Sequence, residues 1–127
     1  MEIPMAKSVL VVDDSKTVRQ QVSQPIKAAG YSIIEACDGT EALAQLGNND
    51  IAMVICDVNM PGISGIELLE TLREQGMHAA VPFVMLTTEG QTTLVERAKK
   101  AGAKGWIVKP FKADLLVAAV KKLAGAP

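Results

Sequence analysis

The chain has 127 residues, 49% of them hydrophobic, and a formal net charge of −1. This length predicts one domain, residues 1–127, with its own buried core and no output domain. A charge so close to zero argues against a general binder of nucleic acid or of membrane surfaces.

The two cysteines, Cys37 and Cys56, are too few for a disulfide framework. Residues 1–7 lack the apolar stretch of a signal peptide, and no apolar run approaches the ~20 residues that span a bilayer. We therefore expect a cytoplasmic protein with reduced thiols.

Five short apolar runs alternate with five segments of helical periodicity. The predicted strands cover 8–12, 31–36, 51–56, 81–86 and 106–108. The predicted helices cover 15–29, 40–46, a segment marked by Ile66, Leu69 and Leu72, 92–101 and 112–123. Alternation with short connections predicts an α/β fold in which helices cover both faces of a five-stranded parallel sheet.

Helix boundaries are clearest around the first predicted helix. Ser15 is a suitable N-cap, and Gly30 is a suitable stop. Pro25 falls inside the helical pattern, where its missing N–H is expected to kink the helix.

Polar side chains follow the apolar runs at the points where the strands end. Asp13 and Asp14 follow the first run, Asp57 the third, Thr87 the fourth and Lys109 the fifth. Open α/β sheets bind their ligands at the carboxyl ends of the strands. We therefore expect these groups to meet at one edge of the sheet.

Three carboxylates at one edge repel one another unless a cation or shared protons intervene. Oxygen ligands of this kind suit Mg²⁺, although an Asp pair after a strand is also a common helix cap. Asp57 can act as a nucleophile that forms an acyl phosphate, with Lys109 and Thr87 stabilising the transferring oxygens. Taken singly, Thr87 and Lys109 also fit a loop cap and a solvated strand end.

Four motifs together resemble the CheY-like receiver domains of bacterial two-component response regulators. They are Val12-Asp13-Asp14-Ser15, Asp57-Val58-Asn59-Met60-Pro61-Gly62, Leu86-Thr87-Thr88-Glu89 and Lys109-Pro110-Phe111. The resemblance covers essentially the whole chain. It implies a doubly wound, flavodoxin-like sheet with strand order 2-1-3-4-5.

The resemblance also implies a metal and a phosphoacceptor. Asp57 would accept a phosphoryl group from the phosphohistidine of a histidine kinase. Mg²⁺ would be coordinated by Asp57 and Asp14 directly, by Asp13 through water, and by the backbone carbonyl of Asn59. The chain would be a phosphoacceptor that assists its own phosphorylation and dephosphorylation, not an enzyme with a separate substrate.

Further expectations from the resemblance concern the other strand ends. Lys109 would bridge Asp57 and the phosphoryl oxygens, through a cis Lys109-Pro110 peptide bond. Thr87 would move to hydrogen-bond the phosphoryl group. Asn59 and Glu89 would tune the approach of hydrolytic water, in a combination similar to that of fast-turnover chemotaxis proteins.

The charge is unevenly distributed, and this bears on partners. Residues 1–89 hold 12 acids and 5 Lys or Arg, a net charge of −7, whereas residues 90–127 hold 2 acids and 8 Lys or Arg, a net charge of +6. The basic segment includes Lys99, Lys100 and Lys104, beside Trp106. It fits a face for an acidic partner, and equally helix surfaces that simply use lysine.

Trp106 stands where the receiver family usually has Tyr or Phe. It is expected either to stay fixed outward or to switch rotamer with Thr87. The expected partners are a histidine kinase, a downstream target such as the flagellar motor switch, and a phosphatase. We expect a monomer that acts in chemotaxis through the motor switch; a phosphate sink and a relay intermediate are the alternatives.

Two other classes compete with the receiver hypothesis. A haloacid-dehalogenase-type phosphatase also uses a strand-end Asp with Mg²⁺, but it wants a second Asp where this chain has Asn59. A flavin-binding module places a phosphate after its first strand, where Asp13 and Asp14 would repel it.

Overall fold

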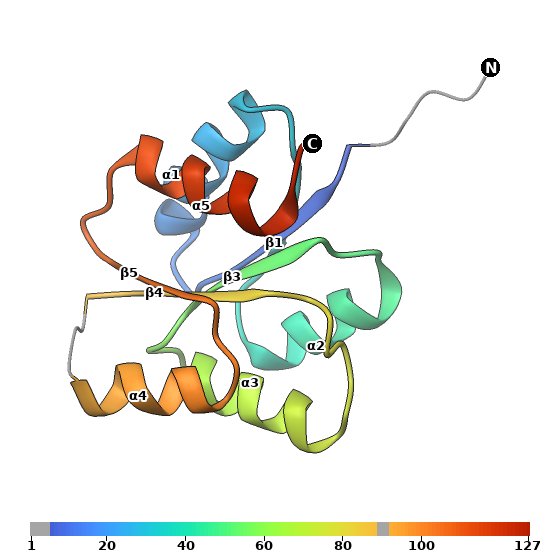
Figure 1. Ribbon diagram of the computed structural model, residues 1–127, viewed down its shortest axis with the longest axis vertical. Helices are drawn as coiled ribbons and strands as arrows, with labels where there is room; N and C mark the ends of the chain where they lie inside the picture. Colours follow the sequence, from blue (N-terminus) through green and yellow to red (C-terminus); the bar gives the residue numbers. More distant parts are fainter. Residues whose placement is uncertain (1–5, 89–91) are drawn as a thin grey trace.

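The structure is a computed structural model that describes residues 6–88 and 92–127. Strands and helices alternate along this part of the chain (Figure 1). In chain order they are β1 (Ser8–Val12), α1 (Lys16–Ala28), β2 (Ser32–Ala36), α2 (Gly39–Asn48), β3 (Met53–Asp57), α3 (Gly65–Glu74), β4 (Phe83–Thr87), α4 (Thr92–Lys100), β5 (Gly105–Val108) and α5 (Ala113–Ala124).

The strands form one parallel sheet in the order β2-β1-β3-β4-β5, which confirms the predicted fold class and topology. Helices α1 and α5 cover one face, and α2, α3 and α4 cover the other (Figure 1). Because the strands are parallel, their carboxyl ends share one edge of the sheet. We call this edge the carboxyl edge, and the opposite one the amino edge.

The apolar runs are continuous because the central strands are buried on both faces. Along β1, Val9 and Val11 pack beneath α1 and α5, whereas Leu10 and Val12 pack toward the other three helices. Met53 and Val54 of β3 separate in the same way. Two apolar layers therefore sandwich the sheet and fix its register.

The predicted bounds of four strands were wrong by one or two residues. β2 begins at Ser32 instead of Tyr31, β5 begins at Gly105 instead of Trp106, and the larger differences are in β3 and β4. β3 begins at Met53 instead of Ile51, and β4 begins at Phe83 instead of Val81. Ile51 and Val81 are apolar because they pack against the core, not because they pair within the sheet. Both strands also end one residue later than predicted, so Asp57 and Thr87 are their last residues and pair within the sheet.

Local signals set the helix ends. The Ser15 hydroxyl accepts a hydrogen bond from the Val18 amide, which confirms the predicted N-cap of α1. Gly30 follows the helix with a φ of 104°, a conformation that suits glycine. α1 continues through Pro25 as one element. Among the described residues, no helix has the length and apolar character needed to cross a bilayer.

Candidate phosphoacceptor site

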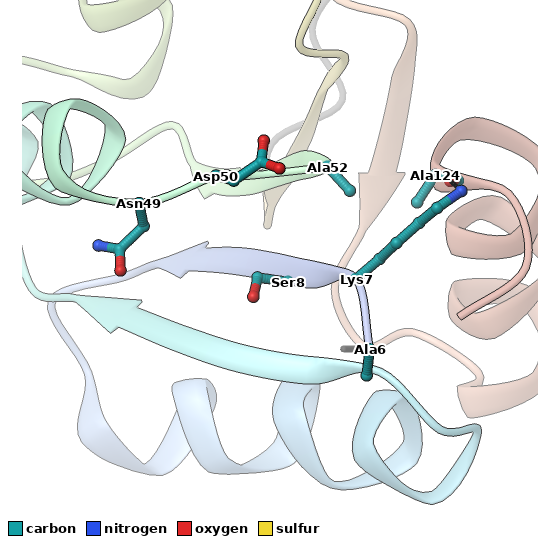
Figure 2. A pocket seen from close by; sticks show the side chains of 7 residues that line it. All are labelled: Ala6, Lys7, Ser8, Asn49, Asp50, Ala52 and Ala124. Carbon is teal, nitrogen blue, oxygen red and sulfur yellow. Dashed lines mark hydrogen bonds between the residues drawn. The ribbon is translucent and has the colours of Figure 1, made fainter. Parts of the chain in front are cut away.

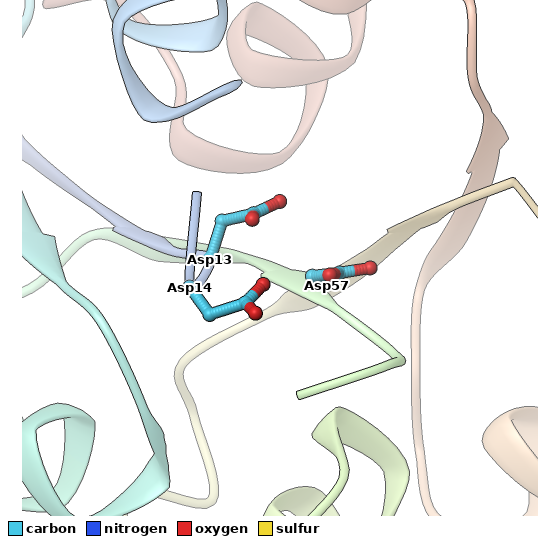
Figure 3. A group of neighbouring side chains, drawn as sticks. All are labelled: Asp13, Asp14 and Asp57. Atoms are coloured by element: carbon cyan, nitrogen blue, oxygen red, sulfur yellow. The ribbon is translucent and has the colours of Figure 1, made fainter. Parts of the chain in front are cut away.

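Three carboxylates meet at the carboxyl edge, as predicted. Asp13 and Asp14 follow β1, and Asp57 ends the neighbouring strand β3. Ligand oxygens of the three residues all lie within 4.8 Å of one another (Figure 3). Asp13 and Asp57 are buried, whereas Asp14 is exposed, so the group is open to solvent on one side.

Lys109 completes this group from the end of β5. Its Nζ atom lies 3.1 Å from an oxygen of Asp13 and 3.6 Å from an oxygen of Asp57. Its backbone N–H donates to the Thr87 carbonyl at 2.7 Å, which fixes the loop beside β4. The Lys109-Pro110 peptide bond is cis, as the family resemblance implied.

The Asp57 carboxylate is buried beside two other carboxylates, those of Asp13 and Asp14. Burial raises the pKa of the Asp57 carboxyl above its ordinary value, and the neighbouring Asp13 carboxylate raises this pKa further. Lys109 and a backbone hydrogen bond from Asn59 lower it in part. One ammonium group thus serves two buried carboxylates, and a further cation would relieve the remaining repulsion.

Of the other predicted site residues, Thr87 and Asn59 lie in the described part of the chain and Glu89 does not. Thr87 is fully buried at the end of β4, beside the strand that carries Asp57. The Asn59 N–H donates to Asp57 Oδ1 over a long 3.4 Å. Glu89 lies outside the described residues. The roles given to Thr87, Asn59 and Glu89 by the resemblance therefore stay predictions.

Sequence reasoning missed two residues that hold this site. A Cβ atom placed on Gly65, the first residue of α3, would lie 2.2 Å from the Asp57 carbonyl oxygen, so only glycine fits there. The sequence signal for this position is the capping box formed by Ser64 and Glu67, which starts α3 against the site. Arg19 donates to the Asp13 carbonyl from α1, and no motif points to that contact.

The predicted basic residues and Trp106 lie on α4, on β5 and in the turn between them. Lys99, Lys100 and Lys104 are exposed, as is Leu115 on α5, with 62% of its surface accessible. Trp106 is half-buried against the core and lines a groove of about 380 Å³ that also includes Phe111 and Leu115. Apolar and cationic groups therefore adjoin one another on this side of the domain.

The donor set at the carboxyl edge fits Mg²⁺. Its ligand atoms are carboxylate oxygens, and Mg²⁺ typically binds through one or two carboxylates, with water and phosphate completing its shell. The exposed Asp14 leaves room for such ligands beside the buried pair. We therefore assign Asp13, Asp14 and Asp57 as the side chains able to hold the metal.

Comparison with known proteins agrees with this geometry. Residues 9–121 match the model of the response regulator receiver domain. Chemotaxis protein CheY of Pseudomonas aeruginosa is 34% identical over 116 residues, covering 91% of this chain and 94% of the relative. Chemotaxis protein CheY1 of Helicobacter pylori is 39% identical over 110 residues, covering 85% and 89%.

A solved structure of chemotaxis protein CheY4 from Vibrio cholerae shares 40% identity, with a TM-score of 0.86. The match covers 94% of this chain and 99% of that one. The comparisons give no support to the phosphatase alternative, and they agree with a phosphoacceptor role. The chain belongs to the response regulator receiver domain family and closely resembles the chemotaxis proteins within it.

Proposed function

We propose that Asp57 accepts a phosphoryl group from the phosphohistidine of a histidine kinase, and that the phosphorylated chain acts as a chemotaxis signal. The observation that carries this proposal is the placement of Lys109 between Asp13 and Asp57, inside a group of three carboxylates. A purely structural strand end gains nothing from such repulsion.

The transfer uses groups already in place. An Asp57 oxygen attacks phosphorus, the new P–O bond forms as the P–N bond breaks, and the electron pair returns to the imidazole nitrogen. Lys109 stabilises the charge on the transferring oxygens. Mg²⁺, held by Asp13, Asp14, Asp57 and the Asn59 carbonyl, supplies further charge neutralisation when bound.

Access for the donor comes from the side of α1. A groove of about 560 Å³ is lined by Lys109 and Thr88 and by Val18 and Gln21 of α1. A phosphohistidine in this groove would lie beside Lys109, the cation that contacts Asp57. The same proposal places the protein in the cytoplasm, where Cys37 and Cys56 would stay reduced.

The target reads the phosphorylated state on the basic face, which we define as Lys99, Lys100, Lys104 and Trp106. An acidic target with apolar side chains complements its exposed ammonium groups and the adjoining groove beside Trp106. The relatives' names as chemotaxis proteins support a chemotaxis setting. Within that setting we propose a motor-switch target, with a phosphate sink or a relay intermediate as the alternatives.

Acetyl phosphate and Mg²⁺ test the phosphoacceptor directly, with intact mass as the readout. We expect the wild-type chain to gain the mass of one phosphoryl group, and hydroxylamine to remove it as expected for an acyl phosphate. Asp57→Asn should gain nothing, whereas the control Asp50→Asn, at the amino edge, should behave as wild type. An adduct that persists in Asp57→Asn would overturn the assignment.

The chemotaxis setting needs a second experiment. We expect a pull-down from the source cell to capture a motor component only when Mg²⁺ and beryllofluoride are present. Capture of a histidine phosphotransfer protein alone would favour the relay alternative. Emission from Trp106, the single tryptophan, reports in the same samples whether its surroundings change.

A further inference from the structure

Arg19 links three parts of the molecule around the acidic site. From the first turns of α1, its Nη1 group donates to the Asp13 backbone carbonyl at 2.7 Å. Its Nε group donates to a carboxylate oxygen of Glu35, on β2, at 2.9 Å. The Arg19 side chain is only 15% exposed, although Glu35 is 43% exposed, so the guanidinium is enclosed between helix and sheet.

The contact with Asp13 has a specific geometric consequence. A carbonyl oxygen and the N–H of the next residue lie in one peptide plane. By holding the Asp13 carbonyl, Arg19 therefore fixes the plane that leads into Asp14. The Asp14 side chain is exposed, so the direction of its backbone decides whether its carboxylate faces Asp57.

Other hydrogen bonds hold the N–H and the carboxylate of Asp13, and the Arg19 bond adds a restraint on its carbonyl. The Asp13 N–H donates to the Ala36 carbonyl at 3.1 Å. Its carboxylate accepts from the Ser15 amide at 2.9 Å and from Lys109 at 3.1 Å. These bonds orient the Asp13 side chain and amide, whereas the Arg19 bond orients the carbonyl that precedes Asp14.

Arginine suits this role better than lysine does. Its planar group presents several donors in a fixed fork, so it can hold a carbonyl and a carboxylate at the same time. The Glu35 carboxylate offsets the charge of Arg19. The guanidinium can therefore lie near the acidic site without acting mainly as a competing cation.

We propose that Arg19 is a positioning residue, which sets the Asp13-Asp14 peptide so that both carboxylates can bind Mg²⁺ beside Asp57. This inference rests on the proposed phosphoacceptor function. Arg19 would not itself bind the metal or the phosphoryl group, and acts through the backbone between Asp13 and Asp14.

Mg²⁺ binding to Arg19→Met tests the proposal by isothermal titration calorimetry. Methionine keeps an apolar stem of similar length but removes every donor. We expect the dissociation constant for Mg²⁺ to rise about tenfold, as is typical when an outer-shell partner of a metal site is lost. With acetyl phosphate, half-maximal phosphorylation should need correspondingly more Mg²⁺, while the rate at saturating Mg²⁺ stays near that of wild type.

Arg73→Met is the matched control. Arg73, on α3, also donates to two backbone carbonyls, those of Ala101 and His78 at 3.2 and 3.3 Å, but away from the acidic site. We expect it to lose thermal stability and to keep wild-type Mg²⁺ affinity. If Arg19→Met loses stability but keeps its Mg²⁺ affinity, Arg19 is only structural and the proposal is wrong.

Two further outcomes separate this inference from the proposed function. Wild-type protein that neither binds Mg²⁺ nor accepts a phosphoryl group overturns both. Should Arg19→Met not fold, Arg19→Lys carries the test, because one ammonium cannot reproduce the fork. An intermediate loss of Mg²⁺ affinity in Arg19→Lys supports the proposal, and an unchanged affinity overturns it.

Discussion

The two edges of the sheet are both polar, but they arrange their charges in opposite ways. At the amino edge, Lys7 Nζ donates to the Ala124 carbonyl at 2.8 Å, and the Tyr31 hydroxyl donates to the Gly125 carbonyl. Figure 2 shows Lys7 reaching from the start of β1 toward the end of α5. A cation and a hydroxyl therefore meet the negative end of a helix, which stabilises the fold.

At the carboxyl edge, like charges converge instead. Asp57 lies with two other carboxylates around a single Lys109 ammonium, and its burial adds to their repulsion. The amino edge also has a hollow of about 500 Å³, lined in part by Lys7, Asn49 and Asp50. The proposed metal and phosphoryl site is thus distinguished by uncompensated negative charge and not by the presence of a hollow.

The largest expected effect distinguishes the two lysines. Lys109→Met should slow phosphorylation by acetyl phosphate about 100-fold, because it removes a cation from the transferring oxygens. Lys7→Met, at the amino edge, should change the rate less than twofold. Time courses of adduct mass at saturating Mg²⁺ measure both rates, and equal slowing by the two variants would contradict the comparison.

Glycine substitutions test how tightly the carboxyl edge is packed. Gly65→Ala should destabilise the fold by about 2 kcal/mol, because the new methyl group overlaps the Asp57 carbonyl oxygen. Gly47→Ala is the control, since no atom lies within 4 Å of its Cβ position inside α2. It should instead stabilise by about 0.5 kcal/mol. Urea unfolding measures both free energies.

The ionised Asp57 carboxylate should lower the stability of the metal-free protein at neutral pH. Its pKa is raised in the folded state, so folding is favoured when Asp57 is protonated. This contribution to the free energy of unfolding is complete below the ordinary pKa of 3.8. It is lost as the pH rises through the raised pKa. Asp57→Asn should therefore melt about 3 °C higher than wild type near pH 7 without Mg²⁺.

The same comparison at lower pH is the internal control. The difference in melting temperature should shrink as the pH falls through the raised pKa toward 3.8, and Mg²⁺ should reduce it at pH 7. A difference that is independent of pH would show that Asp57 is not under electrostatic strain.

The smallest effect belongs to the amino edge. Lys7→Met should destabilise by about 0.5 kcal/mol, because it removes an exposed cation from the carbonyl end of α5. Chemical unfolding at low and high salt measures this contribution, and Mg²⁺ binding should not change. A loss of Mg²⁺ affinity in this variant would show that the two edges are coupled.

Much of the fold and of the site could be predicted from the sequence because each depends on local pattern. Continuous apolar runs marked the buried strands, and strand-end residues such as Asp57 and Lys109 marked the carboxyl edge. The starts of β3 and β4 were misplaced because Ile51 and Val81 pack in the core but lie before the paired residues of their strands. Apolar character alone does not distinguish packing from pairing.

The sequence by itself determined which groups meet at the carboxyl edge, because parallel strands bring their ends together whatever the details of packing. Only the tertiary structure decided how those groups are held. Lys109 lies closer to Asp13 than to Asp57, Gly65 admits no side chain beside the Asp57 carbonyl, and Arg19 donates to the Asp13 carbonyl. Such contacts depend on where a neighbouring element packs, and no local pattern in the sequence encodes that distance.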